Sequence, residues 1–325
     1  MANHPNHRSW HALLAGVAML GSVAGPACAA ATTTYPAAVG HDFRDRDWTP
    51  ELVVIPPGHF VMGSSEAETT REQRAAEPAA FERPQHEVVF GSALAVGKYH
   101  VTVAEFDRFV KATQRTTVFE GCMVDQHGSW SKQAGRSYLD PFFKQAGDHP
   151  AVCVTWSDAT DYAAWLTAQT GHKYRLLHED EWEYAARGGS ASARWWGDSS
   201  ANLCHYANGA DISFDKANPG DKQANLSCDD GYDGTNPGNA YPANPFGLHD
   251  MLGNAWQWLD DCFRPRYDAA MPAEASCQRR VIRGGSWHNY PNVLRSANRF
   301  SLEPGNRSSS IGFRIAREPD QPGAQ

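Results

Sequence analysis

The segment of residues 279–316 constrains the fold more than any other part of the chain. Two β-forming stretches beside glycines, 281–282 and 313–315, predict core strands. Between them, residues 287–310 show almost no apolar periodicity, so we expect a long loop there and no helix. Long ordered loops carried by rigid strands are where binding and catalysis concentrate. We therefore expect this segment to form the rim of a functional site.

Polar side chains of this loop are expected to hold it in place. One interpretation is that its arginines bind a ligand. The other is that they only fix the loop through hydrogen bonds to backbone carbonyls. Both interpretations remain open from the residues alone, which are Arg295, Asn298, Arg299 and Arg307.

Composition limits the fold class and the partners. Of the 325 residues, 41% are hydrophobic and 20% are charged, a balance that suits a globular domain with a sizeable core. The formal net charge of −8 makes nucleic acid an unexpected partner. With 11 Trp, 28 Gly and 20 Pro, we expect a loop-rich domain with little regular structure. We assign residues 49–318 to one domain, between a polar linker at 31–48 and a polar tail at 319–325.

Residues 1–30 are interpreted as a secretory signal peptide. A weakly basic start precedes a run of small apolar residues, and Ala27-Cys28-Ala29 offers a cleavage site with small flanking residues. A membrane anchor is the alternative, but the apolar run is short for a bilayer span. A lipid on Cys28 is disfavoured because no aliphatic residue directly precedes it in the usual position. We therefore expect a periplasmic or secreted protein with no membrane span after cleavage.

The cysteines predict a disulfide framework. Six remain after the signal peptide, and an even number in an exported chain indicates three bonds. Many pairings are possible, and pairing of sequence neighbours is favoured. Each bond would stabilise the fold by about 3 kcal/mol in the chain-entropy model. No Cys-x-x-Cys occurs, so a structural zinc site is not expected. The expected bonds are Cys122–Cys153, Cys204–Cys228 and Cys262–Cys277.

The pattern along the chain predicts short strands and three helices. Thr102 and Glu105 form a capping box before an apolar face, which indicates a helix start. Ser157 is expected to cap the second helix. Residues 179–187 predict the third, with acidic residues in the first turn and Gly188 after the last. The expected strands outside the C-terminal segment are residues 52–55, 60–63, 86–90 and 152–154.

Three stretches show no regular pattern. Residues 63–83 are charged and contain prolines, so we expect an exposed loop. Residues 122–148 are also expected to be irregular. Residues 195–241 are rich in Asn, Asp, Gly and aromatic residues without a helical period, which predicts an ordered coil.

The absence of their sequence motifs argues against several classes of hydrolase. After the signal peptide, no histidine pair lies at i, i+4 and no His-Glu-x-x-His occurs, so a zinc hydrolase is not expected. Gly-x-Ser-x-Gly and Walker loops are also absent from the sequence. Two oxygen-rich clusters suit calcium, a hard cation that binds side-chain and carbonyl oxygens, although such residues also form ordinary turns. These clusters are Asn208, Gly209, Asp230 and Tyr232, and Asp250, Gly253, Ala255 and Gln257.

Ordered motifs along most of the chain carry a family resemblance. The chain from residue 52 to residue 317 resembles the formylglycine-generating enzyme, or sulfatase-modifying factor, family. The resemblance implies an α+β fold with one irregular C-type-lectin-like domain, low regular secondary structure and bound calcium. Its motifs are residues 57–63, residues 179–189, His205-Tyr206-Ala207-Asn208, Asn244-Pro245-Phe246-Gly247-Leu248, Leu252-Gly253-Asn254-Ala255-Trp256-Gln257-Trp258, Arg283-Gly284-Gly285-Ser286-Trp287 and Ile311-Gly312-Phe313-Arg314.

The resemblance also implies which residues would hold calcium. Carried over by motif, the two oxygen-rich clusters correspond to two calcium sites. The second departs from the family pattern, because Gln257 stands where the enzymes usually have Glu. A neutral amide removes a charge and a ligand oxygen, so we expect weaker binding at this site.

The larger departure concerns catalysis. Enzymes of this family oxidise a sulfatase cysteine with molecular oxygen, using two cysteines just after Gly-Gly-Ser-aromatic that also hold copper(I), a metal that thiolates select. In this chain, residues 288–294 occupy that place and contain no cysteine. Asn289 falls where the first would be. We therefore expect neither copper nor cysteine-to-formylglycine conversion by that mechanism.

Two functional hypotheses follow from the resemblance. Some relatives act in periplasmic maturation of siderophores such as pyoverdine, so the chain would be an oxidoreductase-descended factor that matures a protein or siderophore-type substrate. In that case His288 is the titratable group beside the loop, with Tyr290 and Arg295 or Arg299 as acid and anion holder. His288 equally fits a surface histidine that is hydrogen-bonded to its neighbours.

The alternative hypothesis is a non-catalytic C-type-lectin-like binding module. Aromatic, Asn and Arg side chains suit recognition of a peptide or a sugar. The candidate ligand-binding residues are Trp287, Asn289, Asn298 and Arg307.

Overall fold

The computed structural model describes residues 34–126, 128–219, 226 and 228–320. Helices account for 22% and strands for 23% of the structure, and short sheets are joined by long irregular segments. This confirms the predicted α+β domain with low regular structure. The expected signal peptide, including Cys28, lies outside the described residues. Among the described residues, no helix is long and apolar enough to cross a membrane.

A five-stranded sheet forms one part of the domain. Its second strand, residues 52–55, is fully buried, as its run of four aliphatic residues predicted. The edge strand pairs with it through Asp42 and Phe43, so part of the segment expected to be a linker belongs to the sheet. In order across the sheet, the strands are β1 (Asp42–Phe43), β2 (Leu52–Ile55), β5 (Leu94–Gly97), β13 (Ile315–Arg317) and β8 (Tyr174–Leu176).

A four-stranded sheet carries the C-terminal segment. It confirms the predicted strand at 281–282. The second predicted strand, 313–315, is divided at Arg314, so that Phe313 belongs to this sheet and Ile315 to the five-stranded one. The four-stranded sheet also contains a strand within residues 287–310, where we expected only a loop. This edge strand pairs antiparallel with its neighbour, with Ser301 opposite Val281. The sequence of this strand, Arg-Phe-Ser-Leu, is too short to reveal its alternation. In order, the strands are β11 (Arg299–Leu302), β10 (Arg280–Arg283), β9 (Trp256–Cys262) and β12 (Ile311–Phe313), and β12 runs parallel to β9.

Two hairpins stand apart from these sheets. The first, β3 (Gly58–Met62) and β4 (His86–Phe90), was predicted as two strands. The second, β6 (Cys122–Gln126) and β7 (Ser129–Gln133), contradicts the expectation of an irregular stretch. Its second strand is exposed along most of its length, so no buried face imposes an alternating pattern on its sequence.

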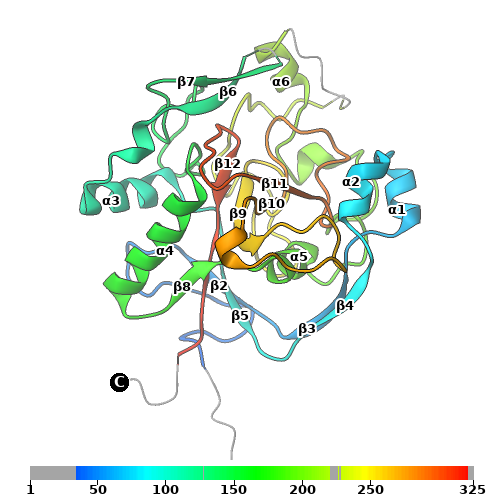
Figure 1. Ribbon diagram of the computed structural model, residues 1–325, viewed down its shortest axis with the longest axis horizontal. Helices are drawn as coiled ribbons and strands as arrows, with labels where there is room; N and C mark the ends of the chain where they lie inside the picture. Colours follow the sequence, from blue (N-terminus) through cyan, green and yellow to red (C-terminus); the bar gives the residue numbers. More distant parts are fainter. Residues whose placement is uncertain (1–33, 127, 220–225, 227, 321–325) are drawn as a thin grey trace, which may run out of the picture. The chain divides into compact units, whose positions relative to one another are not determined.

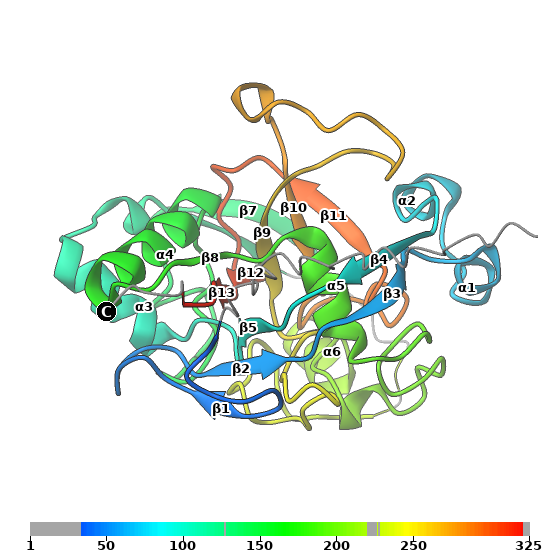
Figure 2. The same ribbon diagram turned by 90° about the horizontal axis from the view of Figure 1, so that it is seen from below.

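The helices lie on two sides of the central strands. Figures 1 and 2 show α3 and α4 together on one side of β9 and β12, and α1 and α2 on the opposite side. The longer helices are α3 (Val103–Thr113), α4 (Trp156–Thr170) and α5 (Glu179–Arg187), and the short ones are α1 (Glu66–Arg71), α2 (Ala76–Phe81) and α6 (Ile212–Ala217). Single turns of 3₁₀ helix occur at Thr117–Phe119, Leu203–His205 and Glu274–Ser276.

The ends of the longer helices carry the residues and hydrogen bonds that are typical of helix caps. The predicted box is present at α3, where the Thr102 side chain accepts from the Glu105 N–H at 3.3 Å and the Glu105 carboxylate accepts from the Thr102 N–H at 2.9 Å. The predicted cap of α4 was wrong, because Thr155 and not Ser157 occupies that position. Both ends of α5 are as predicted, and Gly188 follows it with a left-handed φ of +55°.

Three further expectations were wrong. Residues 63–83 contain α1 and α2 and bury carboxylates, because buried arginines from elsewhere in the chain neutralise them. Residues 195–241 contain α6, which Asp211 caps by accepting from the Ser213 N–H at 2.8 Å. Residues 152–154 are buried as expected but form no strand, and Cys153 has a positive φ of +59°.

The larger of the two main apolar clusters includes side chains of α3, α4 and the four-stranded sheet. Phe106 of α3 and Tyr162 of α4 both pack against Phe313 of β12, with ring centroids 6.0 and 5.4 Å apart. All three side chains are almost completely buried. Packing on β12 therefore anchors the end of the C-terminal segment.

All three expected disulfides are present: Cys122–Cys153, Cys204–Cys228 and Cys262–Cys277. Each joins sequence neighbours, as predicted. The six described cysteines are thus all paired, and none of them is a free thiol.

Buried ion pairs hold the segment between β10 and β12. Arg295 is 0% exposed and donates to both carboxylate oxygens of Glu82, at 2.5 and 3.0 Å, and to Glu68 at 2.6 Å. Arg299 donates to both oxygens of Glu179, at 2.6 and 2.7 Å. The alternative in which these arginines fix the loop is therefore the one observed, and carboxylates are the main acceptors. A buried charge that loses its partner is strongly destabilising.

We predict that Arg295→Met lowers the free energy of unfolding by about 3–5 kcal/mol, because it leaves buried Glu82 and Glu68 without their main counter-charge. Urea denaturation measures this. The control is Lys111→Met, which removes an exposed pair with Asp107 on α3 and should barely change the midpoint. Equal effects of the two substitutions would contradict this account.

Candidate functional site

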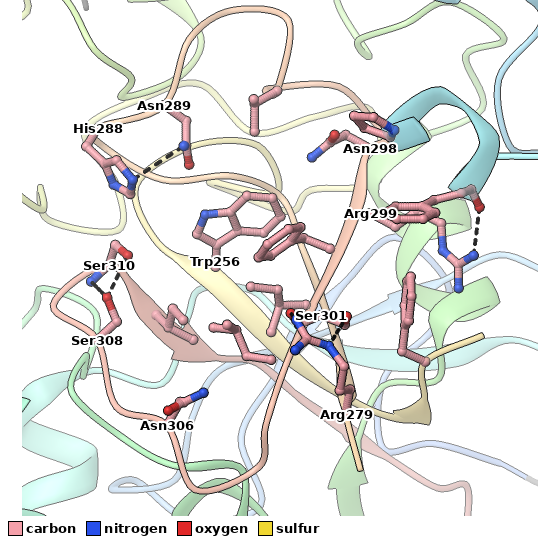
Figure 3. Close-up of a pocket in the computed structure, with 18 of the residues that line it drawn as sticks. Trp256, Arg279, His288, Asn289, Asn298, Arg299, Ser301, Asn306, Ser308 and Ser310 are labelled. Carbon is pink, nitrogen blue, oxygen red and sulfur yellow. Dashed lines mark hydrogen bonds between the residues drawn. The ribbon is translucent and has the colours of Figure 1, made fainter. Parts of the chain in front are cut away.

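A pocket of about 970 Å³ opens beside the edge strand β11 (Figure 3). All four residues of β11 line it, together with residues of β9, β10 and β12 and of the loop that follows β10. Helix α2 and the β6–β7 hairpin supply two further walls. The segment that the sequence analysis expected to form a site rim therefore does line a pocket.

The floor of the pocket is apolar. Trp256, Ile282 and Ile311 lie there, and each is at least nine-tenths buried. Phe300 stands beside Trp256, with ring centroids 6.2 Å apart, and is 46% exposed. An apolar floor with polar groups around it is typical of a small-molecule site.

His288 lies on the wall of the pocket and is held by a ring of hydrogen bonds. The Ser286 hydroxyl donates to Asn289 Oδ1 at 2.9 Å, which leaves Ser286 Oγ to accept from His288 Nδ1 at 3.0 Å. Asn289 Nδ2 approaches His288 Nε2 at 3.4 Å. This pattern assigns the proton to Nδ1 and leaves the lone pair on Nε2.

Aromatic rings surround His288. The Trp130 and Trp287 rings lie 4.9 and 5.3 Å from it, centroid to centroid. Desolvation lowers the pKa of His288 to about 4. The imidazole is therefore neutral at pH 7, and the expectation of a pKa near neutrality is not met. A neutral ring whose Nε2 carries a lone pair is able to accept a proton, in exchange for the long 3.4 Å contact from Asn289 Nδ2.

Asn289 occupies the place where the resemblance puts the first catalytic cysteine. Its side chain fixes Ser286 and His288, and its carbonyl accepts from the Ala210 N–H at 3.0 Å. This position therefore serves to orient its neighbours. Trp287, expected to touch a ligand, instead packs inward against Phe143 and donates from Nε1 to the Ser309 carbonyl at 3.2 Å.

The remaining candidates divide between the pocket and the interior. Asn298 and Arg307 line the pocket, as does the strand residue Arg299, but the Arg299 guanidinium is bound to Glu179. Tyr290 and Arg295 are not among the lining residues. Of the four candidate catalytic side chains, His288 is thus the one that combines a place on the pocket wall with an acceptor nitrogen, whose one contact is the long one from Asn289 Nδ2.

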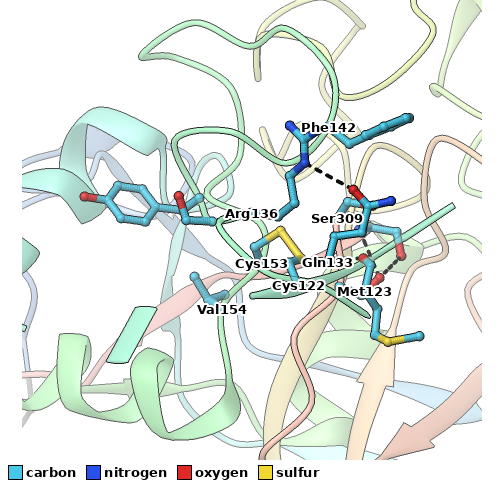
Figure 4. Close-up of a disulfide and its surroundings, with 12 residues drawn as sticks. Cys122, Met123, Gln133, Arg136, Phe142, Cys153, Val154 and Ser309 are labelled. Atoms are coloured by element: carbon cyan, nitrogen blue, oxygen red, sulfur yellow. Dashed lines mark hydrogen bonds between the residues drawn. A yellow bond between two sulfur atoms is a disulfide. The ribbon is translucent and has the colours of Figure 1, made fainter. Parts of the chain in front are cut away.

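A disulfide supports one wall of the pocket. Figure 4 shows the Cys122–Cys153 bond beside Met123 and Ser309. Met123 donates its N–H to the Arg307 carbonyl and accepts from the Ser309 N–H, both at 2.9 Å. The bond therefore ties the hairpin that carries Met123 to the core.

Sequence reasoning missed several pocket residues. Trp256 belongs to one of the family motifs, but Trp258 of the same motif and Trp182 are buried in the core. Residue type alone therefore does not show which tryptophan lines the pocket. Trp130 lies far from His288 in the sequence and gave no signal. Arg279 was treated as part of a strand segment and not as a site residue, although it lines the pocket.

The first oxygen-rich cluster has features of a cation site. Asn208 is 0% exposed, and its Oδ1 has no hydrogen-bond donor within the described residues, while its amide donates to the Gly234 carbonyl at 2.8 Å. The Asp230 carboxylate accepts from the Tyr232 N–H at 2.8 Å, and burial raises its pKa to about 6. A buried oxygen without a donor suits a hard cation. Of this cluster, Asn208 Oδ1 is thus the atom that suits a cation, whereas both carboxylate oxygens of Asp230 already accept hydrogen bonds, one from the Tyr232 N–H and one from the Tyr241 hydroxyl at 2.6 Å.

The second cluster is more fully occupied. Asp250 has one buried oxygen without a donor among the described residues, and burial raises its pKa to about 7. However, Gln257 Oε1 already accepts from Trp182 Nε1 at 2.9 Å and from Arg314 Nε at 3.1 Å. The Ala255 carbonyl accepts from His100 Nε2 at 2.9 Å.

These contacts weaken the case for calcium at the second cluster, where a cation would compete with a guanidinium. Across the described ranges, no group of three or more His, Cys, Asp or Glu side chains is placed to hold a metal ion. A cation at either cluster would therefore depend on amide and carbonyl oxygens as well.

Comparisons of the sequence and of the structure with known proteins point to the same family. Residues 40–319 match the model of the sulfatase-modifying factor enzyme 1-like domain. The formylglycine-generating enzyme of Streptomyces coelicolor is 32% identical over 336 residues, which cover 92% of this chain and 97% of that protein. The enzyme of Bos taurus is 30% identical over 302 residues, covering 82% of this chain and 75% of that protein.

Solved structures agree with this family assignment. PvdO from Pseudomonas aeruginosa matches with a TM-score of 0.70 and 33% identity, over 87% of this chain and 99% of that chain. Variable protein 1 of Treponema denticola matches with a TM-score of 0.59 and 19% identity, over 86% of this chain and 99% of that chain. The second likeness extends to the fold alone.

We predict that Asn289→Asp raises the pKa of His288 above its value of about 4, because an adjacent carboxylate favours the imidazolium. NMR titration of the imidazole nitrogens measures this pKa. Asn306→Asp is the control, since it adds the same charge to the same pocket away from the ring (Figure 3). A His288 pKa that does not respond to Asn289→Asp would contradict the hydrogen-bonded ring.

The same pKa has a consequence for stability. Because the pKa in the folded state lies below the ordinary value of 6.5, the ring's contribution to stability is present above pH 6.5 and is lost as the pH falls toward 4.

Proposed function

The chain belongs to the sulfatase-modifying factor enzyme 1-like family, and on that premise we propose that it is an exported factor that matures a siderophore-type or protein substrate. The substrate would bind in the pocket beside β11, with its reacting group facing His288. The observation that carries this proposal is His288 itself: a neutral imidazole, held in one tautomer, on the wall of a large apolar pocket.

The reaction class that we propose is a two-electron oxidation by molecular oxygen. The substrate loses two hydrogen atoms, and dioxygen takes up two electrons and two protons to become hydrogen peroxide. His288 Nε2 accepts a substrate proton and passes it on, while Ser286 and Asn289 hold the ring. The buried side chains of Trp256 and Ile282 keep water away from the floor. This route uses no thiolate, which suits a chain whose described cysteines are all paired.

Export to the periplasm or beyond is part of the proposal. Three disulfides support an oxidising compartment, because such bonds persist outside the cytosol. The N-terminal pattern of residues 1–30 is consistent with this.

We also propose calcium at the first oxygen-rich cluster. Asn208 Oδ1 and the Asp230 carboxylate would be its side-chain ligands, with carbonyl oxygens from Gly209 and Tyr232. Calcium there would be structural, because it would join the segment before α6 to the segment that follows Cys228. The engaged state of Gln257 supports a weaker site, or none, at the second cluster.

A non-catalytic binding module is the second candidate function. It is supported by the ion pairs of Arg295 and Arg299, which remove two of the proposed catalytic groups from the reaction. In that case the same pocket would hold a peptide or sugar without turnover.

The test of the proposed reaction is oxygen uptake with a periplasmic extract of the organism that encodes the chain. We expect uptake with the wild-type protein and a rate about 100-fold lower for His288→Gln, since general acid–base catalysis contributes at least this much. His41→Gln is the control, because His41 is exposed and does not line the pocket. An unchanged rate for His288→Gln would rule out the assigned base. No uptake at all would favour the binding module.

Calcium should raise the thermal midpoint of the chelator-treated protein. At a free concentration about 100 times the Kd, the expected stabilisation is about 2.7 kcal/mol. Asp230→Asn should remove most of the calcium-dependent shift, while Asp229→Asn should keep it, since the exposed Asp229 pairs with Lys216. Loss of the shift in both variants, or in neither, would be evidence against the assigned ligands.

A further inference from the structure

Arg279 differs from the other arginines that line the pocket. Arg299 binds Glu179, and Arg307 lies 3.3 Å from Asp158. Arg74 lies 3.7 Å from Glu82. For Arg279, no carboxylate is within ion-pair distance among the residues that the structure describes. The pocket wall thus holds an exposed guanidinium that has no counter-charge among the described residues.

The Arg279 guanidinium is held in position without being neutralised. Its Nε donates to Ser301 Oγ at 2.9 Å, and Nη2 donates to the Ser301 carbonyl. Both contacts are to uncharged acceptors on β11. Because a guanidinium has five N–H groups, these two bonds leave Nη1 and part of Nη2 available to a ligand. The Cys262–Cys277 bond closes the chain just before Arg279, which restricts the backbone there.

The apolar floor separates Arg279 from His288. Figure 3 shows Trp256 in the middle of the pocket, with His288 and Asn289 on one side and Arg279 with Ser301 on the other. A ligand that reaches from one side to the other must cross the rings of Trp256 and Phe300. Such a ligand gains most from a flat apolar part.

We infer that the pocket takes an aromatic ligand that carries an anionic group, and that Arg279 is the residue that binds this anion. The inference rests on the proposed function for the identity of the site and adds the chemical class of the substrate. A planar oxyanion, such as a carboxylate or a sulfonate, matches the two-pronged guanidinium. With its anion at Arg279, the ligand's aromatic part lies over Trp256 and its far edge faces His288.

The preference for an anion follows from the charges of the lining. Glu77 is the carboxylate among the lining residues, and it is exposed on α2. The other pocket arginines already face protein carboxylates, so an incoming anion gains most at Arg279. In a protein of net charge −8, general attraction does not explain anion binding, and a specific cation is required.

The test compares two fluorescent probes that differ by one charge. 8-Anilino-1-naphthalenesulfonate carries a sulfonate, and N-phenyl-1-naphthylamine has the same rings without it. We expect the wild-type protein to bind the sulfonate probe more tightly. Arg279→Gln should weaken that binding by about tenfold and leave the neutral probe unchanged. Arg266→Gln, which removes an exposed arginine paired with Asp268 outside the pocket, should change neither.

Two further measurements separate the loss of the anion-binding contact from a loss of folding. Ser301→Ala should weaken the sulfonate probe to a smaller extent, because it frees the guanidinium without removing it. Near-ultraviolet circular dichroism checks that each variant is folded. Equal affinity for the two probes, or equal losses in Arg279→Gln and Arg266→Gln, would overturn the inference. Since no step depends on turnover, absence of oxygen uptake would count against the proposed reaction and not against this binding result.

Discussion

Buried arginine–carboxylate pairs are the interaction on which the rest of the structure depends. The segment between β10 and β12 has one short strand and no helix, so its own backbone hydrogen bonds do not fix it. Instead, Arg295 reaches Glu82 just after α2, and Arg299 reaches Glu179 at the start of α5. Arg283 adds a pair with Glu183 of the same helix. Each pair joins parts of the chain about a hundred or more residues apart, and a guanidinium binds a carboxylate in a fixed orientation.

Those pairs explain why a pocket exists beside a loop-rich segment. Arg299 lies on β11, so its bond to Glu179 holds the strand that forms one wall. Another wall is held by the Cys122–Cys153 disulfide and the hydrogen bonds of Met123. In this protein sulfur serves to fix the pocket's walls, whereas the family resemblance assigns cysteines to catalysis. The group that faces the pocket at the corresponding place is His288, oriented by Ser286 and Asn289.

Local features were predictable from the sequence, and long-range partners were not. The capping box at Thr102 and the limits of α5 involve residues a few positions apart, so the sequence shows them directly. The disulfides were predictable because each joins neighbouring cysteines. By contrast, nothing near Arg295 in the sequence indicates Glu82, and this missing partner is also why residues 63–83 were taken for an exposed loop.

The candidate site shows the same limit. The position of His288 followed from its place after Gly-Gly-Ser-Trp, but its low pKa comes from burial, and Trp130 of a distant hairpin packs beside the ring. The β6–β7 hairpin itself was missed because an exposed strand has no buried face to impose alternation. Arg279 was overlooked because the inference about it rests on the lack of a carboxylate partner among the described residues, and only the arrangement of the pocket reveals that.

The central proposal is that the pocket beside β11 serves a function that does not use the cysteine chemistry of the formylglycine-generating enzymes. The most direct test is to incubate the purified protein with a Cys-x-Pro-x-Arg peptide, oxygen and copper(I), and to follow the peptide by mass spectrometry. We predict that the cysteine remains unconverted, because the described cysteines all lie in disulfides. Appearance of the aldehyde at the cysteine position would contradict the proposal.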